Sequence, residues 1–285
     1  MLEAVHPRRY VETLEQMSAR GGGQLDLDTG MSAGSFAAAV HAAGGAARLA
    51  ELLVERSVPT GFSAHRPPGH HASAARAMGF CLFNSIAVAA AHAVAGLGLE
   101  RVMIFDWDVH HGNGTNDIFH ASDRVLFVSV HQSPLYPGTG PASDVGTGAG
   151  TGYTVNLPVP PGSGDPAYCA LVDHVVVPLA RAFEPQLLLI SAGYDAHHED
   201  PLADCQVTEA GFAGMTHSLR RVGLEVGAPL GFVLEGGYAL EALARSVAAT
   251  MEAMVGDLPE VVGDSPPMTP LAEAARRRLA EYWTL

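Results

Sequence analysis

Short apolar runs alternate with longer Ala-rich stretches of helical periodicity along most of the chain. Five of the apolar runs are predicted to be buried strands, at residues 60–64, 101–105, 125–130, 186–191 and 231–234. The longer periodic stretches are predicted helices, at residues 33–55, 85–95, 166–183, 208–226 and 240–255. Apolar strands that alternate with helices predict a mainly parallel sheet with helices on both faces. The 285 residues fit a single α/β domain over 1–285.

The segment 133–164 interrupts this alternation. It contains "YPGTG", "GTGAGTG" and "PVPPGSG", with one short predicted strand at 153–157. Loops of this length in a compact domain commonly form functional walls. Gly44 and Gly45 fall inside the first predicted helix and indicate close packing or a kink there. A final amphipathic helix is expected after the Pro-rich passage that follows Gly256.

Composition narrows the functional classes. Hydrophobic residues make up 48% of the chain and charged residues 16%, which favours a folded core over disorder. Because no stretch has the roughly 18 uninterrupted apolar residues of a membrane span, no membrane partner is expected. Three scattered cysteines without a C-x-x-C pair, and no secretory signal, favour the cytoplasm. A net charge of −14 argues against direct nucleic-acid binding and favours amine-bearing substrates; a homo-oligomer stays open.

The stretch "FDWDVHHGNG" places titratable side chains directly after a predicted buried strand. Unpaired buried charge is costly, so these groups should share a proton, a metal or a ligand. Asp108 and His110 lie two positions apart, and in an extended chain both side chains point the same way. A third carboxylate, Asp195, follows the strand at 186–191, and the carboxyl ends of parallel strands gather ligands. Two oxygens, one nitrogen and an open position form the donor set of a catalytic zinc or iron(II) site.

Two further strand ends carry side chains suited to catalysis. "SAHRPPGHHA" brings His70 and His71 behind a rigid turn, where one imidazole could accept a proton and return it. "VLEGGY" brings Tyr238 after two glycines, and its hydroxyl could hydrogen-bond an oxyanion. His197 and its polar neighbours His198 and Glu199 are expected to lie in a solvated loop instead.

A set of motifs occurs in a fixed order along the chain: "RPPGHHA", "AMGFCLFNSIAVAA", "DWDVHHGNGT", "VSVHQ", "YPGTG", "VNLP", "SAGYDAHHEDPL" and "VLEGGY". Together they resemble the zinc-dependent histone deacetylases, in particular the class II branch and its bacterial histone deacetylase-like amidohydrolases. The likeness extends from "VHPRRYVETLE" to about residue 255, which is nearly the whole chain.

This resemblance implies an arginase–deacetylase α/β fold and an enzyme that removes acyl groups, in particular acetyl, from lysine side chains or related amines. It implies a zinc ion held by Asp108, His110 and Asp195. His71 matches the general base and acid, His70 a mainly electrostatic partner, and Asp106 the carboxylate behind His70. Asn113 stands where some relatives have an aspartate behind His71, so the proton affinity of His71 is expected to differ from theirs.

The resemblance also implies a substrate channel. Phe80 and Tyr136 match its two aromatic walls, with Gly79 beside them. Asp28 matches the rim carboxylate that holds the substrate backbone, although Asp26 competes for that role. Leu202 stands where the polyamine-selective branch has a glutamate, and an apolar side chain cannot compensate a buried ammonium. Acyl-lysine substrates are therefore expected over acetylated polyamines.

Two potassium or sodium sites are implied as well. The inner site corresponds to Asp106, Asp108, His110, Ser129 and Val130. The outer site corresponds to Phe119, Ser122, Val125 and Tyr153. Hard oxygen ligands suit such cations.

Other interpretations of the sequence stay open. The chain could be an acetylpolyamine amidohydrolase, or a catalytically silent scaffold that binds acyl-lysine. A ureohydrolase of the same fold would need further acids where Gly112 and Asn113 stand. Relatives usually carry several dozen residues before the match to "VHPRRY", so an N-terminal edge element of the family fold is expected to be missing.

Overall fold

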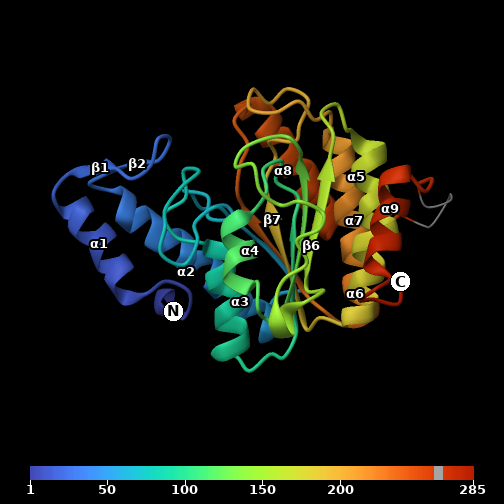
Figure 1. Cartoon of the computed structure of the whole chain (residues 1–285), viewed down its shortest axis with the longest axis horizontal. Helices are drawn as coiled ribbons and strands as arrows, with labels where there is room; N and C mark the ends of the chain where they lie inside the picture. The colour runs from blue at the N-terminus through green and yellow to red at the C-terminus, as the bar shows by residue number, and fades with distance from the viewer. Residues whose placement is uncertain (260–265) are drawn as a thin grey trace.

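A six-stranded parallel sheet forms the centre of the computed structural model, which describes residues 1–259 and 266–285 (Figure 1). The strands lie in the order β3-β8-β7-β4-β5-β6. Their bounds are β3 (Thr60–Ser63), β4 (Val102–Asp106), β5 (Val125–Gln132), β6 (Thr154–Val159), β7 (Leu187–Ala192) and β8 (Leu230–Leu234). Near the N-terminus, β1 (Gly22–Gln24) and β2 (Gly30–Ser32) form a separate antiparallel pair.

Helices follow or precede nearly every strand. They are α1 (Arg8–Ala19), α2 (Ser35–Val54), α3 (Ser85–Ala95), α4 (Asn113–Phe119), α5 (Asp165–Leu171), α6 (Val177–Phe183), α7 (Glu209–Val226), α8 (Leu240–Val255) and α9 (Pro270–Leu279). A π turn (Val172–Val176) joins α5 to α6, so residues 165–183 run on without a loop.

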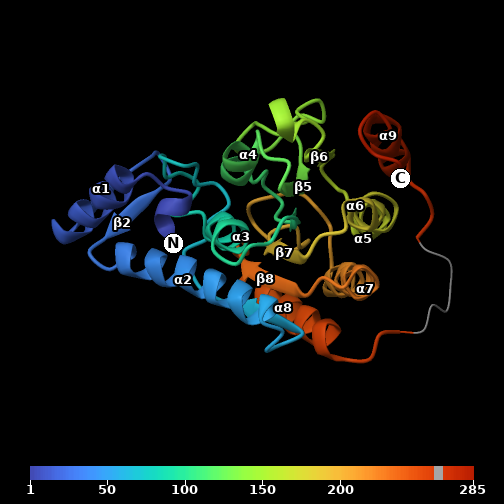
Figure 2. The same cartoon turned by 90° about the horizontal axis from the view of Figure 1, so that it is seen from below.

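The sheet lies between two helical layers (Figure 2). Alternate residues of β4 pack against the two helical layers, because neighbouring side chains of a strand point to opposite faces of the sheet. Ile104 packs in the cluster formed with α2 and α3, whereas Phe105 packs in the cluster formed with α5, α6, α7 and α9. Both faces of the central strands are therefore buried, which explains their continuous apolar runs.

These observations confirm the predicted α/β class, with a parallel sheet covered on both faces. The predicted strands and helices occur with ends shifted by one or two residues, except that the 166–183 helix contains the π turn. Elements that sequence periodicity did not predict are α1, β1, β2 and α4. In α1 only Leu14 and Ser18 are buried, so its apolar signal is weak.

The helix α2 stays unbroken through its two glycines. A Cβ at Gly45 would lie 2.4 Å from the His65 ring, so this glycine allows close packing and makes no kink. By length and composition alone α2 could cross a membrane. In this fold, however, Leu49, Ala50 and Leu53 are buried against the sheet, as in an ordinary core helix.

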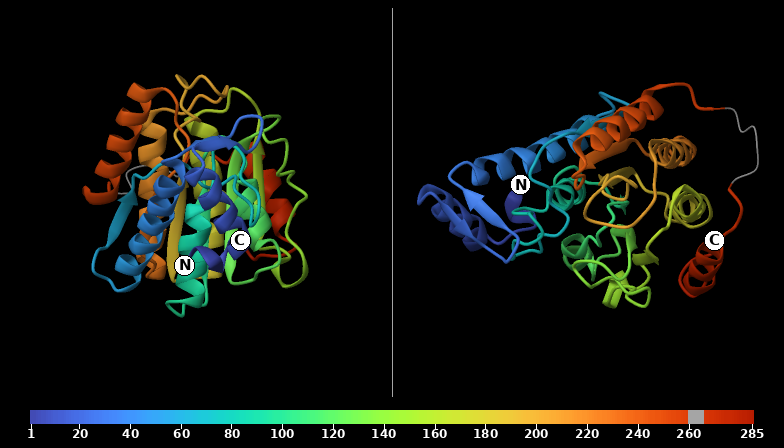
Figure 3. Two further views of the ribbon diagram at one scale, coloured as in Figure 1. Left: turned by 90° about the vertical axis from the view of Figure 1, so that its left-hand side faces the viewer. Right: turned by 90° about the horizontal axis from the view of Figure 1, so that it is seen from above.

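The N-terminal segment lies at one end of the molecule, beyond α2 and α3 (Figures 1 and 3). There α1, β1 and β2 pack around a small cluster of their own, which includes Leu14, Met31 and Phe83. The turn between β1 and β2 reaches toward residues 79–80, where Thr29 Oγ1 accepts a hydrogen bond from the Phe80 N–H (3.0 Å). This contact brings the N-terminal segment to the rim described below.

Candidate active site

Three polar segments converge where β4, β7 and β8 end. Asp106, the last residue of β4, lies opposite Ser129 of β5 and Ser191 of β7 in the strand register. Ser191 in turn lies opposite Val233 of β8, two residues before Glu235. The segments that follow these strands therefore share one edge of the sheet, as the sequence predicted.

The predicted metal ligands form one buried group. His110 Nδ1 lies 3.2 Å from Asp108 Oδ1 and 3.0 Å from Asp195 Oδ2. One donor atom from each of the three residues falls within 4.8 Å of the others. The three side chains can therefore contact one ion together.

Glycines and main-chain amides hold the two carboxylates in place. A Cβ at Gly193 would lie 2.1 Å from Asp108 Oδ2, and one at Gly236 would lie 2.1 Å from Asp195 Oδ2. The Gly236 N–H donates to Asp108 Oδ2 (2.8 Å), and the Val109 N–H donates to Asp195 Oδ1 (2.9 Å). Only residues without a side chain let the backbone approach the carboxylates this closely.

The charge of this group fits a divalent cation. Asp108 and Asp195 are buried, and no arginine forms an ion pair with either within residues 1–259 and 266–285. Burial, and then the negative charge of Asp108, raises the pKa of Asp195 to about 6. Burial lowers the pKa of His110, but Asp195 and Asp108 outweigh it and raise that pKa to about 10. Two carboxylates and an imidazole with excess negative charge are suited to zinc or iron(II).

The paired imidazoles lie beside these ligands in different environments. The ring centroids of His70 and His71 are 4.1 Å apart. His70 Nδ1 donates to Asp106 Oδ2 (2.9 Å), and although burial lowers the pKa of His70, Asp108 and Asp106 raise it well above its ordinary value. Burial, and then the neighbouring His70, holds the pKa of His71 well below its ordinary value. His70 is thus suited to carry charge and His71 to accept a proton.

Asn113 fixes the tautomer of His71. His71 Nδ1 lies 2.8 Å from Asn113 Oδ1, a neutral acceptor, so Nδ1 carries the hydrogen and Nε2 keeps a free lone pair. An amide oxygen holds the ring in place without the negative charge with which an aspartate would raise its pKa.

Tyr238 completes the group after the Gly236–Gly237 turn. Its ring packs edge-on against Phe80, with centroids 5.8 Å apart. Burial, and then the carboxylates of Asp195 and Asp108, raises the pKa of Tyr238 above its ordinary value. The phenol therefore stays protonated and can donate a hydrogen bond.

A pocket of about 190 Å³ leads to these groups. Its lining consists of Asp28, His71, Gly79, Phe80, His110, Leu135, Tyr136, Leu202 and Tyr238. All five predicted substrate-binding positions therefore share one cavity with the predicted base and phenol. Asp28 lines the pocket, whereas Asp26 pairs with Arg76 (3.3 Å) outside it, which favours Asp28 as the rim carboxylate. Sequence reasoning did not single out Leu135.

Gly79 keeps the pocket open next to His71. A Cβ at this position would lie 2.3 Å from His71 Cδ2, and Gly79 has a φ of +58°. Phe80 follows with a φ of +66°, an uncommon conformation for a bulky residue, which points its ring to the rim. The Gly79 N–H donates to Asp28 Oδ1 (3.3 Å), which ties this turn to the N-terminal segment.

The residues predicted for monovalent cations occupy two separate places. Ser129 and Val130 lie in β5, beside the end of β4. Phe119 and Ser122 are joined by a main-chain hydrogen bond at the end of α4, ahead of Val125. Tyr153 lies beside β5, where its carbonyl accepts the Phe127 N–H (2.9 Å). Cation binding at both places stays a prediction.

Glu235 is a buried acid that sequence reasoning missed. Its Oε2 accepts the N–H groups of Gly69 (2.6 Å) and His70 (3.1 Å), and its Oε1 accepts the Ser191 hydroxyl (3.0 Å). Burial raises its pKa to about 7. The sequence signal that could have indicated it is an acid that directly follows a buried strand. In the structure Glu235 fixes the backbone of the histidine pair.

The expectation that His197 lies in a solvated loop is wrong. Its side chain is fully buried, whereas His198 and Glu199 are exposed as expected. His197 Nδ1 accepts the Glu199 N–H (3.1 Å), and its ring supports the loop from within. The loop folds back on Val207, which a polar sequence pattern does not reveal.

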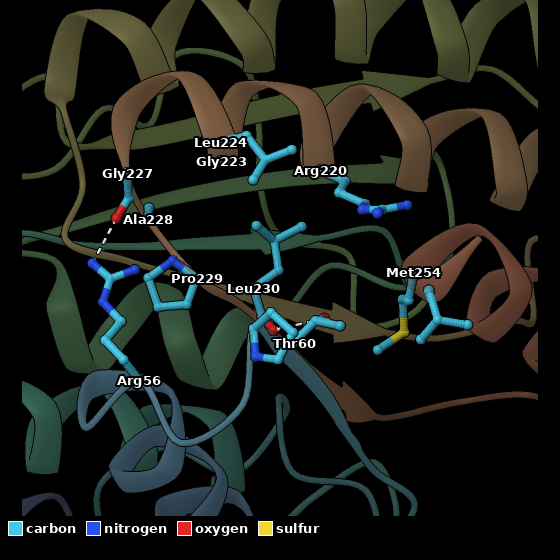
Figure 4. Close-up of a pocket in the computed structure, with 12 residues that line it drawn as sticks. Arg56, Thr60, Arg220, Gly223, Leu224, Gly227, Ala228, Pro229, Leu230 and Met254 are labelled. Atoms are coloured by element: carbon cyan, nitrogen blue, oxygen red, sulfur yellow. Dashed lines mark hydrogen bonds between the residues drawn. The ribbon is translucent and has the colours of Figure 1, made fainter. Parts of the chain in front are cut away.

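A larger cavity at the opposite edge of the sheet, termed the basal cavity, has a different character (Figure 4). Its volume is about 330 Å³, and it lies at the amino ends of β3 and β8. Its lining consists of Arg56, Pro59, Thr60, Arg220, Gly223, Leu224, Gly227, Ala228, Pro229, Leu230, Met254 and Val255. No carboxylate or imidazole belongs to this lining, so it lacks the groups for acid–base or metal chemistry.

Comparison with known proteins agrees with the geometry. A family model described as the histone deacetylase domain matches residues 1–254. The chain belongs to the histone deacetylase family. A solved structure described as the HDA15 HD domain superimposes with a TM-score of 0.91 at 40% identity, covering 99% of this chain and 78% of that one.

Curated relatives of this family include deacetylases from several kingdoms. A probable deacetylase of Archaeoglobus fulgidus is 43% identical over 88% of this chain and 70% of its own length. Histone deacetylase 14, chloroplastic, of Arabidopsis thaliana is 43% identical over 89% of this chain and 63% of its own. A histone deacetylase-like amidohydrolase of Pseudomonas aeruginosa is 41% identical over 82% of this chain and 62% of its own. The chain thus spans about two thirds of the length of these relatives.

Proposed function

We propose that this member of the histone deacetylase family is a zinc-dependent hydrolase that removes acyl groups, chiefly acetyl, from lysine side chains. The observation that supports this most directly is the pocket that ends on His71, Tyr238 and the predicted metal ligand His110. A proton acceptor, an oxyanion donor and a metal ligand thus meet at the end of one channel.

The metal would be held by Asp108, His110 and Asp195. When bound, it would supply Lewis acidity toward the acyl carbonyl and the attacking water. His71 accepts a proton from the water at Nε2 and later delivers it to the departing amine. Tyr238 donates its hydroxyl hydrogen bond to the oxyanion, and His70 with Asp106 supplies fixed charge beside it.

Lysine side chains fit the shape and charge of the pocket. Phe80, Tyr136 and Leu202 give the channel an apolar wall for an aliphatic chain, and all three are partly exposed at the rim. Asp28 stands near the mouth, where it can accept main-chain N–H groups of a peptide. Leu202 offers no charge to a distal ammonium, so acyl-lysine is preferred over acetylated polyamines. The predicted potassium or sodium sites would be structural.

The decisive experiment compares kcat/KM for an acetyl-lysine peptide with that for acetylputrescine and acetylspermidine, together with the zinc content of the protein. The peptide should be preferred, and Leu202→Glu should shift the ratio toward polyamines by about two- to fivefold, since Leu202 is 42% exposed and an ion pair at such a position contributes up to about 1 kcal/mol. A wild-type preference for polyamines would refute the proposed substrate. No turnover of any amide by the zinc-loaded protein would refute the proposed activity.

A further inference from the structure

Asp200 joins two loops that line the active-site pocket. It follows β7 and is buried, with 6% of its surface exposed. Its Oδ2 accepts the N–H groups of Tyr238 (2.7 Å) and Ala239 (3.2 Å), and its Oδ1 accepts the N–H of Leu202 (3.0 Å). Two of these three donors belong to residues of the pocket lining. One side chain therefore ties the turn of Tyr238 to the loop of Leu202.

The turn before Tyr238 needs such an anchor. It consists of Gly236 and Gly237, and glycines leave the backbone more conformational freedom than any other residue. The helix α8 begins directly afterwards, and its N-cap residue Ala239 supplies no side-chain acceptor. Main-chain N–H groups ahead of a helix need acceptors from elsewhere. Asp200 provides them from a different loop.

The loop of Asp200 is itself fixed. The Asp200 N–H donates to His197 O (2.9 Å), and the His198 N–H donates to Val207 O (3.0 Å). The buried ring of His197 accepts the Glu199 N–H (3.1 Å) and so supports this loop from within. Main-chain hydrogen bonds thus fix the loop that contains Asp200, and the Asp200 carboxylate in turn fixes the turn before Tyr238.

We propose that Asp200 is a positioning residue that holds the Tyr238 hydroxyl at the oxyanion through main-chain hydrogen bonds. Asp200 is not part of the pocket lining and acts only through the residues it anchors. The inference rests on the proposed function, because it assigns Asp200 a purpose in the same hydrolysis. If Asp200 acts in this way, substituting it should lower turnover only while the Tyr238 hydroxyl is present.

The test is a double-mutant cycle with Asp200→Asn and Tyr238→Phe on an acetyl-lysine substrate. In Asp200→Asn an amide NH2 replaces one acceptor oxygen and the negative charge is lost, so at least one of the three hydrogen bonds breaks and the others weaken. With the hydroxyl misplaced, kcat should fall by about 10- to 100-fold, while KM changes by less than about threefold. In the Tyr238→Phe background the same change should alter kcat by less than about twofold.

A matched control is Asp165→Asn. Asp165 also accepts a main-chain N–H, that of Thr208 (2.8 Å), as well as the Thr208 hydroxyl (2.7 Å), but it lies outside the pocket lining. Its substitution should lower Tm and leave kcat unchanged in both backgrounds. A second readout is amide hydrogen exchange at Tyr238 and Ala239, which should speed up in Asp200→Asn and not in Asp165→Asn.

Equal losses of kcat from Asp200→Asn in the two backgrounds would overturn the inference, as would wild-type kcat in soluble, zinc-loaded Asp200→Asn. If that variant does not fold, Asp200→Ser, which keeps one acceptor oxygen, enters the same cycle. A wild-type protein without turnover would refute the proposed function instead. In that case unchanged exchange at Tyr238 would also refute the anchoring role of Asp200, and faster exchange would support it.

Discussion

The two ends of the same sheet differ in what they bury. At the carboxyl ends of the strands, the active-site pocket of about 190 Å³ ends on an imidazole and a phenol, with Asp108 and Asp195 buried behind them. At the amino ends, the basal cavity is larger, about 330 Å³, and its two arginines donate to main-chain carbonyls, as in the bond from Arg56 to Gly227 O (2.7 Å). Figure 4 shows this bond beside the apolar side chains.

The volume of a cavity therefore does not locate the candidate active site of this protein. Both cavities are built partly from residues of β8 or of the segment that follows it. The difference is that, in the part of the chain that the structure describes, the buried carboxylates gather at the carboxyl end, where the loops after several strands meet. Buried carboxylates and imidazoles are therefore the better guide to the site.

The largest effect should come from removing a predicted metal ligand. Asp108→Ala and Asp195→Ala should each lose bound zinc and activity together, because three protein ligands are the minimum of a catalytic site. Metal analysis and turnover of an acyl-lysine amide would check this, and the loss should exceed that of any other substitution. Full zinc content in either purified variant would contradict the assignment.

Removing the phenol of Tyr238 or the imidazole of His71 should cause the next largest loss of activity. Tyr238→Phe should keep its zinc and fold but lose about 10²–10³-fold in kcat, the usual effect of removing one oxyanion donor. His71→Ala should lose at least as much, because both proton transfers pass through this ring. Steady-state kinetics across pH would measure both effects. A near wild-type rate and pH profile in His71→Ala would reassign the base to His70.

A smaller effect is expected in the pH dependence of stability. His6 is buried, with Nδ1 bonded to Ala74 O (3.0 Å) and Nε2 accepting the Asn84 N–H (3.0 Å), and burial lowers its pKa. Below pH 6.5 His6 is therefore protonated in the unfolded chain but stays neutral in the folded chain. The free energy of unfolding consequently falls as the pH drops from 6.5 toward the lowered pKa of His6. Above pH 6.5 this contribution is absent.

The substitution His6→Gln, which keeps a neutral acceptor and a donor, should weaken the pH dependence of the free energy of unfolding. Between pH 7.5 and pH 5.5 the free energy of unfolding should fall more in the wild type than in His6→Gln, by up to about 1.4 kcal/mol, the ceiling for one group measured one pH unit below its unfolded pKa. Urea unfolding at the two pH values measures the difference. Parallel losses in the two proteins would show that His6 is not the group that titrates.

The smallest effect should come from the basal cavity. Leu224 is 67% exposed at its edge, so Leu224→Ser should change the free energy of unfolding by less than about 0.5 kcal/mol and leave kcat and zinc content unchanged. Thermal unfolding and turnover provide the check. A clear loss of kcat would mean that the two ends of the sheet are coupled and would refute their separation.

The fold class and most residues of the candidate site could be predicted from local sequence patterns. Strand and helix positions follow from local periodicity, since a side chain that faces a core repeats every two or every 3.6 residues. The predicted ligands Asp108, His110 and Asp195 were singled out because charged side chains that follow an apolar strand are unusual enough to be noticed locally. Their convergence, and that of Phe80, Tyr136 and Leu202 on one pocket, agrees with the prediction.

The roles of several acids could not be predicted from the sequence, because they depend on contacts between segments that lie far apart along the chain. Asp28 and Asp26 are nearly equivalent in sequence, and the fold alone places the first in the pocket and pairs the second with Arg76. Glu235 accepts the Gly69 N–H across 166 positions of chain, which no local pattern records. The same holds for Asp200 and Tyr238. A buried carboxylate is defined by the N–H groups around it, and those are brought together only when the whole sheet has formed.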